Sequence, residues 1–282
     1  MGGGWVLDVD VSGFFDTMRE DVLRDLLRQR VADGVVRRLV GKWLRAGVLE
    51  EGVEHHPETG SPQGGVVSPL LSNIYLHEVF DQWWSDEVAP RMRGRALAIR
   101  YADDLVMAFA EKRDAQRVYA VLAQRFARVG LTLHPDKTRL VRYTRPGPGR
   151  AEPGSFDFLG FTHYWTRSRG GRWVMKRKTA RDRFTRALRA MNQWMKKARH
   201  VPLPEQVRQL NRKLRGHYEA YGIRWNSGSI SRFSQEVKRL WWKWLGRRSQ
   251  RRLTWAAFER LLRRYPPLPP RLPQRSRQLT LS

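Results

Sequence analysis

Two adjacent aspartates, Asp103 and Asp104, stand in the middle of the otherwise apolar segment IRYADDLVMAF. The flanking residues 96–100 and 105–110 have the length and composition of short strands joined by a tight turn, so both carboxylates are expected at the tip of a hairpin. Neighbouring carboxylates repel each other unless a cation lies between them. A lone pair of aspartates in a turn is commonly just a solvated part of that turn. Whether this pair has a function therefore depends on which other residues lie near it.

A further carboxylate comes from the segment WVLDVDV at residues 5–11, which has a strand's length and β-branched content. Side chains two residues apart lie on one face of a strand, so Asp8 and Asp10 share a face. Carboxylate oxygens are preferred ligands of Mg²⁺, and two such ions can activate an attacking hydroxyl and stabilise a leaving pyrophosphate. The strand therefore offers a third aspartate to the pair at the hairpin tip.

The rest of the first half mixes helices with short strands. A Gly/Pro turn precedes Ser68 and Pro69, which suit the cap and first turn of a helix. Other helical patterns surround residues 22–27 and run from Ala115 to Val129, where Gly130 can close the helix. Further short strands are expected within residues 131–141 and 155–165. This order predicts an α+β domain, with an antiparallel sheet and packed helices, over residues 1–166.

From residue 167 onward the pattern is helical, with apolar residues at helical spacing in three successive segments. We predict an all-α helical domain over residues 167–265. Trp241, Trp242 and Trp244 are interpreted as part of its core rather than as platforms for base stacking. The tail at residues 266–282 is rich in Pro and Arg and is expected to be disordered.

The positive charge lies almost entirely in the second half. Residues 1–166 contain 22 Lys and Arg against 22 Asp and Glu, whereas residues 167–282 contain 32 against 5, which accounts for the net charge of +27. Such a charged half attracts phosphate backbones with salt-dependent affinity. An anionic membrane and an acidic protein partner are the alternatives, and nucleic acid is the partner we predict.

Composition excludes several other classes. The 282 residues include no cysteine, so disulfides, thiolate zinc sites and a cysteine nucleophile are absent. No apolar run is long enough to span a membrane, and the first residues do not resemble a signal peptide. We therefore expect a bacterial cytoplasmic protein without a membrane partner.

Five ordered blocks resemble the reverse transcriptases encoded by bacterial group II introns. YADD, residues 101–104, resembles the palm signature, and DVSGFFD, residues 10–16, resembles the first catalytic block. The resemblance implies that Asp10, Asp103 and Asp104 are the catalytic metal ligands, and it leaves Asp8 as a structural residue. It also implies that Phe15 screens the sugar 2′ position, with a core residue as the alternative interpretation.

Another block, SPQGGVVSPLLSNIYL at residues 61–76, is similar to the family block that holds template and incoming nucleotide. The resemblance implies binding roles for Gln63 and Gly64, whose alternative is a plain turn. GLTLHPDKT contains Lys137, for which a phosphate contact or a proton-donor role competes with that of a solvated surface lysine. FDFLGF resembles the primer grip, while residues 213–223 and 244–262 resemble the thumb or maturase-specific region.

The resemblance implies an RNA-directed DNA polymerase, in which a reverse-transcriptase palm at residues 1–166 precedes a basic helical thumb. Its expected partners are template or intron RNA, a DNA primer and deoxynucleoside triphosphates, with two Mg²⁺ ions as cofactors and with splicing assistance as a further role. Family members carry a fingers region before the first catalytic block, whereas this sequence starts seven residues before Asp8. We therefore expect weak activity unless a fingers segment, for example a separately encoded one, is supplied. The alternative is a non-polymerising RNA-binding maturase or remnant.

Overall fold

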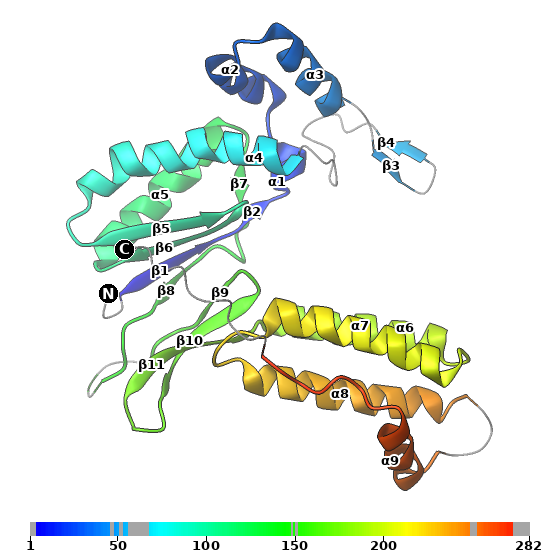
Figure 1. Ribbon diagram of the computed structural model, residues 1–282. Coiled ribbons are helices and arrows are strands. Elements are labelled where there is room, and N and C mark those ends of the chain that lie inside the picture. The colour runs from blue at the N-terminus through cyan, green and yellow to red at the C-terminus, as the bar shows by residue number, and fades with distance from the viewer. Residues whose placement is uncertain are drawn as a thin grey trace, which may run out of the picture. The chain divides into compact units, whose positions relative to one another are not determined.

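The computed structural model describes residues 4–45, 48–50, 53–55, 68–147, 149, 152–248 and 253–272. The chain forms two compact units, Met1–Leu159 and Gly160–Ser282 (Figure 1). We expected the boundary between them after residue 166, and that position lies inside strand β10, Phe161–Arg167.

The first unit is built on a four-stranded antiparallel sheet with the order β5-β6-β1-β8. These strands are β5 (Ala96–Tyr101), β6 (Asp104–Phe109), β1 (Trp5–Val9) and β8 (Arg139–Arg142). β1 comes first in the sequence but lies in the interior of the sheet, where it pairs with β6 on one side and β8 on the other. The predicted hairpin of β5 and β6 is confirmed.

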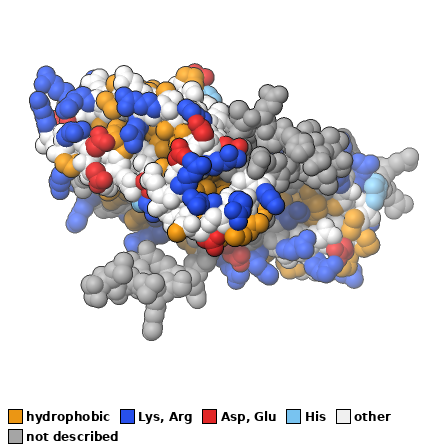
Figure 2. Space-filling view, turned by 90° about the horizontal axis from the view of Figure 1, so that it is seen from above, with side chains coloured by type: hydrophobic (Ala, Val, Ile, Leu, Met, Phe, Trp, Pro, Cys, Tyr) orange, Lys and Arg blue, Asp and Glu red, His pale blue; other side chains and the backbone are white. Residues whose placement is uncertain are grey.

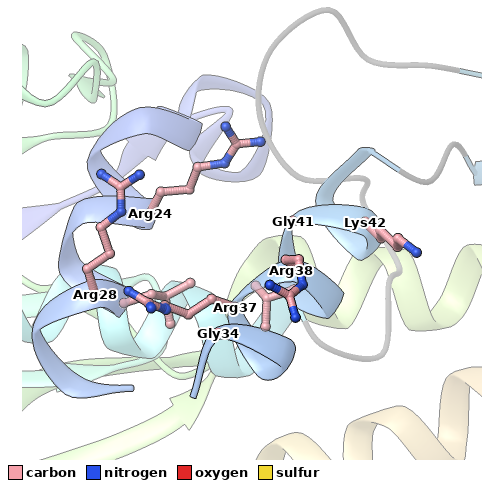
Figure 3. A pocket seen from close by; sticks show the side chains of 9 residues that line it. Arg24, Arg28, Gly34, Arg37, Arg38, Gly41 and Lys42 are labelled. Carbon is pink, nitrogen blue, oxygen red and sulfur yellow. The ribbon is translucent and has the colours of Figure 1, made fainter. Parts of the chain in front are cut away.

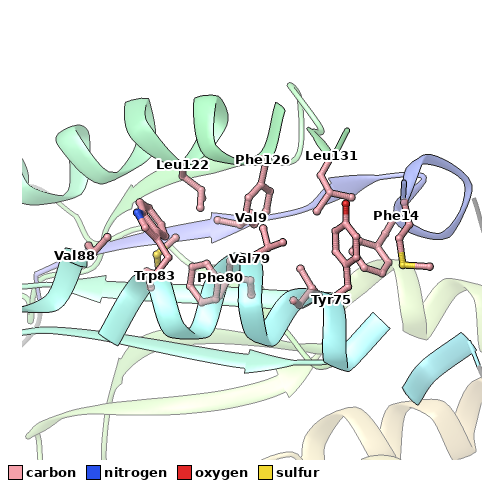
Figure 4. Close-up of a cluster of buried hydrophobic side chains, with 14 of the residues drawn as sticks. Val9, Phe14, Tyr75, Val79, Phe80, Trp83, Val88, Leu122, Phe126 and Leu131 are labelled. Carbon is pink, nitrogen blue, oxygen red and sulfur yellow. The ribbon is translucent and has the colours of Figure 1, made fainter. Parts of the chain in front are cut away.

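Helices cover one face of this sheet (Figure 1). They are α4 (Ser68–Leu76) and α5 (Lys112–Arg128). Leu7 and Val9 of β1 and Met107 of β6 point into the core between sheet and helices, because alternate strand residues face the same side. Figure 4 shows Val9 among Val79, Phe80, Leu122 and Phe126. Burying each such side chain contributes about 1.5–3 kcal/mol, so this core fixes which face of β1 remains for other roles.

The covering helix does not end with α4. It continues through two π-helical stretches, η1 (His77–Gln82) and η2 (Trp84–Val88), and a 3₁₀ turn, η3 (Ala89–Arg91). Tyr75 anchors α4 to the end of α5, because its hydroxyl donates a hydrogen bond of 2.6 Å to the carbonyl oxygen of Val129. Gly130 follows with a φ of 81°, a left-handed conformation that suits glycine and ends the helix as predicted.

On the opposite face, the edge strand β5 leaves three apolar side chains exposed. The exposed fractions of Leu97, Ile99 and Tyr101 are 49%, 48% and 67%. In the register of the sheet, Ile99 lies opposite Val106, and Val106 lies opposite Asp8, so Asp8 and these exposed residues share a face. This is the face toward which Asp10 is directed by the period of two.

Smaller elements complete the first unit. α1 (Phe14–Thr17), α2 (Glu20–Arg30) and α3 (Gly34–Arg45) follow β1, and the remaining strands are β2 (Val11–Ser12), β3 (Val48–Glu50), β4 (Val53–His55), β7 (Thr132–Leu133) and β9 (Phe156–Phe158). β2 pairs with β7, and β3 pairs with β4. The β2–β7 pairing brings the segment after β1 beside the segment that precedes Lys137.

The second unit joins a β-hairpin to a set of helices. Its elements are β10, β11 (Trp173–Thr179), α6 (Arg181–Ala198), α7 (Leu203–Tyr221), α8 (Ser227–Leu245) and α9 (Trp255–Arg264). Trp241 and Trp244 are buried in its core as predicted, whereas Trp242 is 37% exposed. Its ring nitrogen donates to the carbonyl oxygen of Leu253 at 3.0 Å.

The expectation of disorder from residue 266 onward is wrong for the start of that tail. The backbone N–H of Leu268 donates to Oδ1 of Asn211 at 2.7 Å, and its carbonyl oxygen accepts from the hydroxyl of Tyr218 at 3.3 Å. Leu268 also packs against the helical core. Backbone hydrogen bonds and the packed side chain of Leu268 thus hold this segment against α7. No helix in the described part of the chain combines the length and apolar character needed to cross a bilayer.

Candidate active site

The tip of the β5–β6 hairpin carries Asp103 and Asp104. Tyr101 lies opposite Asp104 in the last pair of the ladder, which leaves Ala102 and Asp103 to form the turn. Ala102 has a φ of 53°, a left-handed conformation that costs a non-glycine residue about 1–2 kcal/mol. Both aspartates are exposed at the tip. The hairpin therefore presents two carboxylates to solvent from a backbone turn that something else must stabilise.

Arg100 supplies that stabilisation. Its Nη1 donates to the carbonyl oxygen of Ala102 at 3.0 Å and to Oδ1 of Asn73 at 2.9 Å. Its other nitrogens form a two-pronged pair with Asp81, at 2.9 Å to Oδ1 and 2.5 Å to Oδ2. The Arg100 side chain is only 13% exposed, so the pair is partly shielded from water. Arg100 thus ties the turn to α4 and η1.

Asp10 reaches the same end of the sheet from β1. The last register pair of β1 and β6 is Val9 with Leu105, so Asp10 follows at the strand end next to Asp104. The alternation of the strand turns Asp10 to the face of Asp8, away from the helix-covered core. The register therefore puts Asp10 and the hairpin tip at the same end of the sheet.

The loop before β8 holds the backbone of Asp10 on both sides. The Oγ1 of Thr138 accepts from the Asp10 N–H at 3.3 Å and donates to the Asp10 carbonyl oxygen at 3.1 Å. The N–H of His134 donates to the same carbonyl oxygen at 2.8 Å. Thr138 is buried, whereas the Lys137 side chain is 60% exposed with its Nζ 3.5 Å from Oδ1 of Asp10. Lys137 is thus brought to the candidate site.

Asp8 behaves differently from Asp10. Its carboxylate lies 3.4 Å from Nε of Arg139 and is only 16% exposed. Burial raises the pKa of Asp8 to about 6, and the opposing attraction of Arg139 does not cancel this effect. A shielded carboxylate that faces its own cation supports the interpretation of Asp8 as a structural residue.

The aspartates are hard oxygen donors of the kind that Mg²⁺ takes. Among the described residues, no three His, Asp or Glu side chains lie in an arrangement that could already hold a metal ion. The side chain of Phe15 in α1 is outside the description, and Gln63 and Gly64 lie outside the described residues. Of the predicted site residues, the structure therefore describes the side chains of four: Asp10, Asp103, Asp104 and Lys137.

Sequence reasoning missed the three residues that hold this arrangement in place. Arg100 directly precedes the YADD segment, so its proximity in sequence was a usable signal. Thr138 follows Lys137 within the block GLTLHPDKT, where only the lysine was singled out. Asp81, in contrast, lies in a helical segment with no pattern that connects it to the hairpin.

An antiparallel sheet, two helices on one of its faces and aspartates from two strands at one end define the palm of a nucleic acid polymerase. The chain belongs to the reverse transcriptase (RNA-dependent DNA polymerase) family, whose model matches residues 2–163.

Two bacterial relatives are similar over part of their length. Protein YkfC of Escherichia coli (strain K12) is 35% identical over 133 residues, which cover 37% of this chain and 34% of that protein. The group II intron-encoded protein LtrA of Lactococcus lactis subsp. cremoris is 35% identical over 102 residues, which cover 33% of this chain and 17% of that protein. The chain thus spans about a third or less of the length of these curated relatives. The predicted membership of the group II intron reverse transcriptase and maturase family is confirmed.

A solved structure of apo telomerase from Candida tropicalis is also similar. The match covers 93% of this chain and 49% of the telomerase chain, with 11% sequence identity and a TM-score of 0.46.

Proposed function

We propose that the chain carries the palm of an RNA-directed DNA polymerase of the group II intron type. It copies RNA by letting the 3′-hydroxyl of a DNA primer attack an incoming deoxynucleoside triphosphate. The observation that supports this most is the register of β1 and β6, in which Asp10 follows the Val9–Leu105 pair and ends beside the tip with Asp103 and Asp104. Acidic residues from two separate strands meet there on the face that the helices leave open.

Asp10 and Asp103 are the residues that would hold two Mg²⁺ ions, with Asp104 assisting. Such ions, when bound, activate the attacking hydroxyl and stabilise the leaving pyrophosphate. The protein's own part is positioning: Thr138 fixes the backbone of Asp10, and Arg100 fixes the turn that carries Asp103. Positioning of this kind lowers the barrier because reacting groups need not search for their geometry.

Lys137 brings a cation to this site. Its Nζ is 3.5 Å from Asp10 and its side chain is 60% exposed, so it can reach toward a phosphate group of the incoming nucleotide. Phe15 is proposed to select deoxyribose by excluding the 2′-hydroxyl. Gln63 and Gly64 are proposed to hold template and nucleotide, through a side-chain amide and through close backbone approach.

A second candidate is an RNA-binding maturase that does not polymerise. It is favoured by the charge distribution, since the excess of Lys and Arg lies after residue 166, outside the unit with the aspartates. Residues 167–265 are proposed to grip intron RNA or the primer–template duplex in either case. Assistance in splicing the host intron is compatible with both candidates.

Primer extension on an RNA template distinguishes the two. The purified chain is assayed alone and with a fingers segment taken from a longer relative, either fused or in trans. We expect the wild type to synthesise DNA in one or both of these reactions and Asp103→Asn to synthesise none, whereas Asp86→Asn, an exposed aspartate in η2, should retain synthesis. Failure of every wild-type reaction would favour the RNA-binding maturase. Full activity of Asp103→Asn would refute the aspartate assignment.

A further inference from the structure

Helices α2 and α3 line a partly open pocket of about 630 Å³ in the first unit (Figure 3). Its walls contain five cationic side chains and no carboxylate: Arg24, Arg28, Arg37, Arg38 and Lys42, together with two glycines and two apolar residues. This concentration of charge occurs in the half of the chain that carries no net charge. Figure 2 shows several Lys and Arg side chains, in blue, next to one another on the face seen from above.

The cations on the two helices differ in their partners. Arg24 pairs with Glu20 at 2.5 Å, and Arg28 pairs with Asp25 at 2.8 Å, so α2 neutralises its own charges. On α3, Arg37, Arg38 and Lys42 form no ion pair with any carboxylate that the structure describes. Within the described residues, three cations along one helix thus have no carboxylate partner beside a pocket, where an anionic ligand would stabilise them.

Two of these cations converge on a residue that has no side chain. A Cβ atom added at Gly34 would lie 3.7 Å from Nη1 of Arg38 and 3.8 Å from Nη2 of Arg37. The two guanidinium groups thus border one small open space at the start of α3. Like charges that face the same space repel each other, and a ligand oxygen placed between them removes that repulsion.

The helix N-terminus itself is not the anion site. Oδ1 of Asp33 accepts from the backbone N–H of Val35 at 2.6 Å and so caps the first turn of α3. Any anion must be held by the guanidinium and ammonium groups of the side chains. Guanidinium is well suited to this task because its parallel N–H groups match two oxygens of one phosphate.

We propose that the pocket between α2 and α3 binds consecutive backbone phosphates of a single RNA strand. This goes beyond the proposed function, because it assigns an RNA contact to elements that contain none of the aspartates. Arg38 and Lys42 lie four residues apart on α3, which is about 6 Å along the helix. Charge spread over this length fits a run of phosphates better than one isolated ion.

A carboxylate introduced at Gly34 tests the site without removing any cation. Gly34→Asp would pair with Arg37 and Arg38, and Gly34→Asn is the matched neutral control of the same shape. Binding of a fluorescent, unstructured RNA 12-mer to the full chain is measured by anisotropy in EDTA, so that the aspartate site takes no part. We expect Gly34→Asp to weaken binding about fivefold to tenfold and Gly34→Asn to leave it almost unchanged.

A charge-removal variant provides the second measurement. Substituting Arg37, Arg38 and Lys42 by Gln should reduce the salt dependence, the slope of log K against log salt, by about 2. The control replaces the exposed Arg91, Arg113 and Arg117 by Gln and should change the slope less. The proposal is overturned if both triple variants behave alike and Gly34→Asp binds RNA as the wild type does. It is also overturned if Gly34→Asp loses affinity for tripolyphosphate but not for RNA, because the pocket would then be a triphosphate site.

Discussion

Nη1 of Arg100 donates a hydrogen bond of 3.0 Å to the carbonyl oxygen of Ala102, the residue with left-handed backbone at the hairpin tip. The same guanidinium is held by Asp81, so the turn that carries Asp103 is linked to the helix that covers the other face of the sheet. Arg100 is a positioning residue, because it contacts the backbone of the turn and not the carboxylates of Asp103 and Asp104.

Arg100→Ala should therefore loosen the hairpin tip. Loss of the shielded pair with Asp81 should cost about 2–4 kcal/mol in the free energy of unfolding. Hydrogen exchange of the peptide around residues 99–108 should accelerate at the tip more than elsewhere in the sheet. The control is Arg95→Ala, an exposed arginine just before β5 at the other end of the hairpin. Equal exchange at the tip in both variants would leave Arg100 without a positioning role.

Thr138→Val should displace Asp10. The substitution preserves shape but removes both hydrogen bonds to the backbone of Asp10, and a buried hydrogen-bonded group of this kind is worth about 1–3 kcal/mol. Thr138→Ser keeps the hydroxyl and should restore most of the stability. In primer extension, Thr138→Val should require more Mg²⁺ than the wild type, and an unchanged Mg²⁺ requirement would argue against positioning through Asp10.

Asp8→Asn should stabilise the first unit at neutral pH. The pKa of Asp8 is raised to about 6, so the folded state binds its proton more tightly than the unfolded state does, and this contribution is present at low pH and lost as the pH rises through 6. The gain in the free energy of unfolding from Asp8→Asn should grow by about 2–3 kcal/mol between pH 4 and pH 7. Loss of the attraction between Asp8 and Arg139 reduces this gain. Urea unfolding at several pH values measures it.

Asp21→Asn is the matched control for that experiment. The Arg19 guanidinium holds the pKa of Asp21 below its usual value, so the sign of the pH effect is reversed at this position. A constant difference between wild type and Asp8→Asn across the pH range would show that Asp8 ionises normally.

His217 makes the second unit sensitive to acid. Its ring stacks on Phe233 at 3.6 Å between centroids, and burial lowers the pKa of His217 to about 4. The unfolded chain takes up the proton first, so stability is lost as the pH falls from about 6.5 to 4, by up to roughly 3 kcal/mol. His217→Phe should flatten this part of the stability profile, as followed by the fluorescence of the buried tryptophans. A profile that stays equally steep would place the acid-sensitive group elsewhere.

The sequence predicted those parts of the fold that local patterns determine. The alternation in β5 and β6, the turn between them and the helical spacing in α5 to α8 all depend on residues close together in the chain. The spacing of apolar residues cannot show that Thr138 forms a hydrogen bond with Asp10. The two residues are 128 positions apart in the sequence, and only the completed sheet brings them together. The pair of Arg100 with Asp81 also depends on how the helix packs across the sheet.

Two local patterns were misleading or insufficient. The Pro-rich composition after Tyr265 predicted disorder. Composition alone does not show that the side chain of Leu268 packs against the helical core. The five cations of the α2–α3 pocket were hidden because acidic residues in the same half balance them in the total charge. Charge sums over long segments cannot reveal where cations gather, since helix geometry decides that on a scale of a few residues.

The interior place of β1 in the sheet has a consequence for how the protein is made. The ribosome adds roughly 5–20 residues per second, so the roughly 100 residues between β1 and β6 take about 5–20 s to appear. During that time the newly made segment Trp5–Val9 has neither of its two partner strands. Its apolar side chains are then exposed to other nascent chains and to chaperones. The yield of folded protein should therefore depend on how quickly translation reaches Phe109.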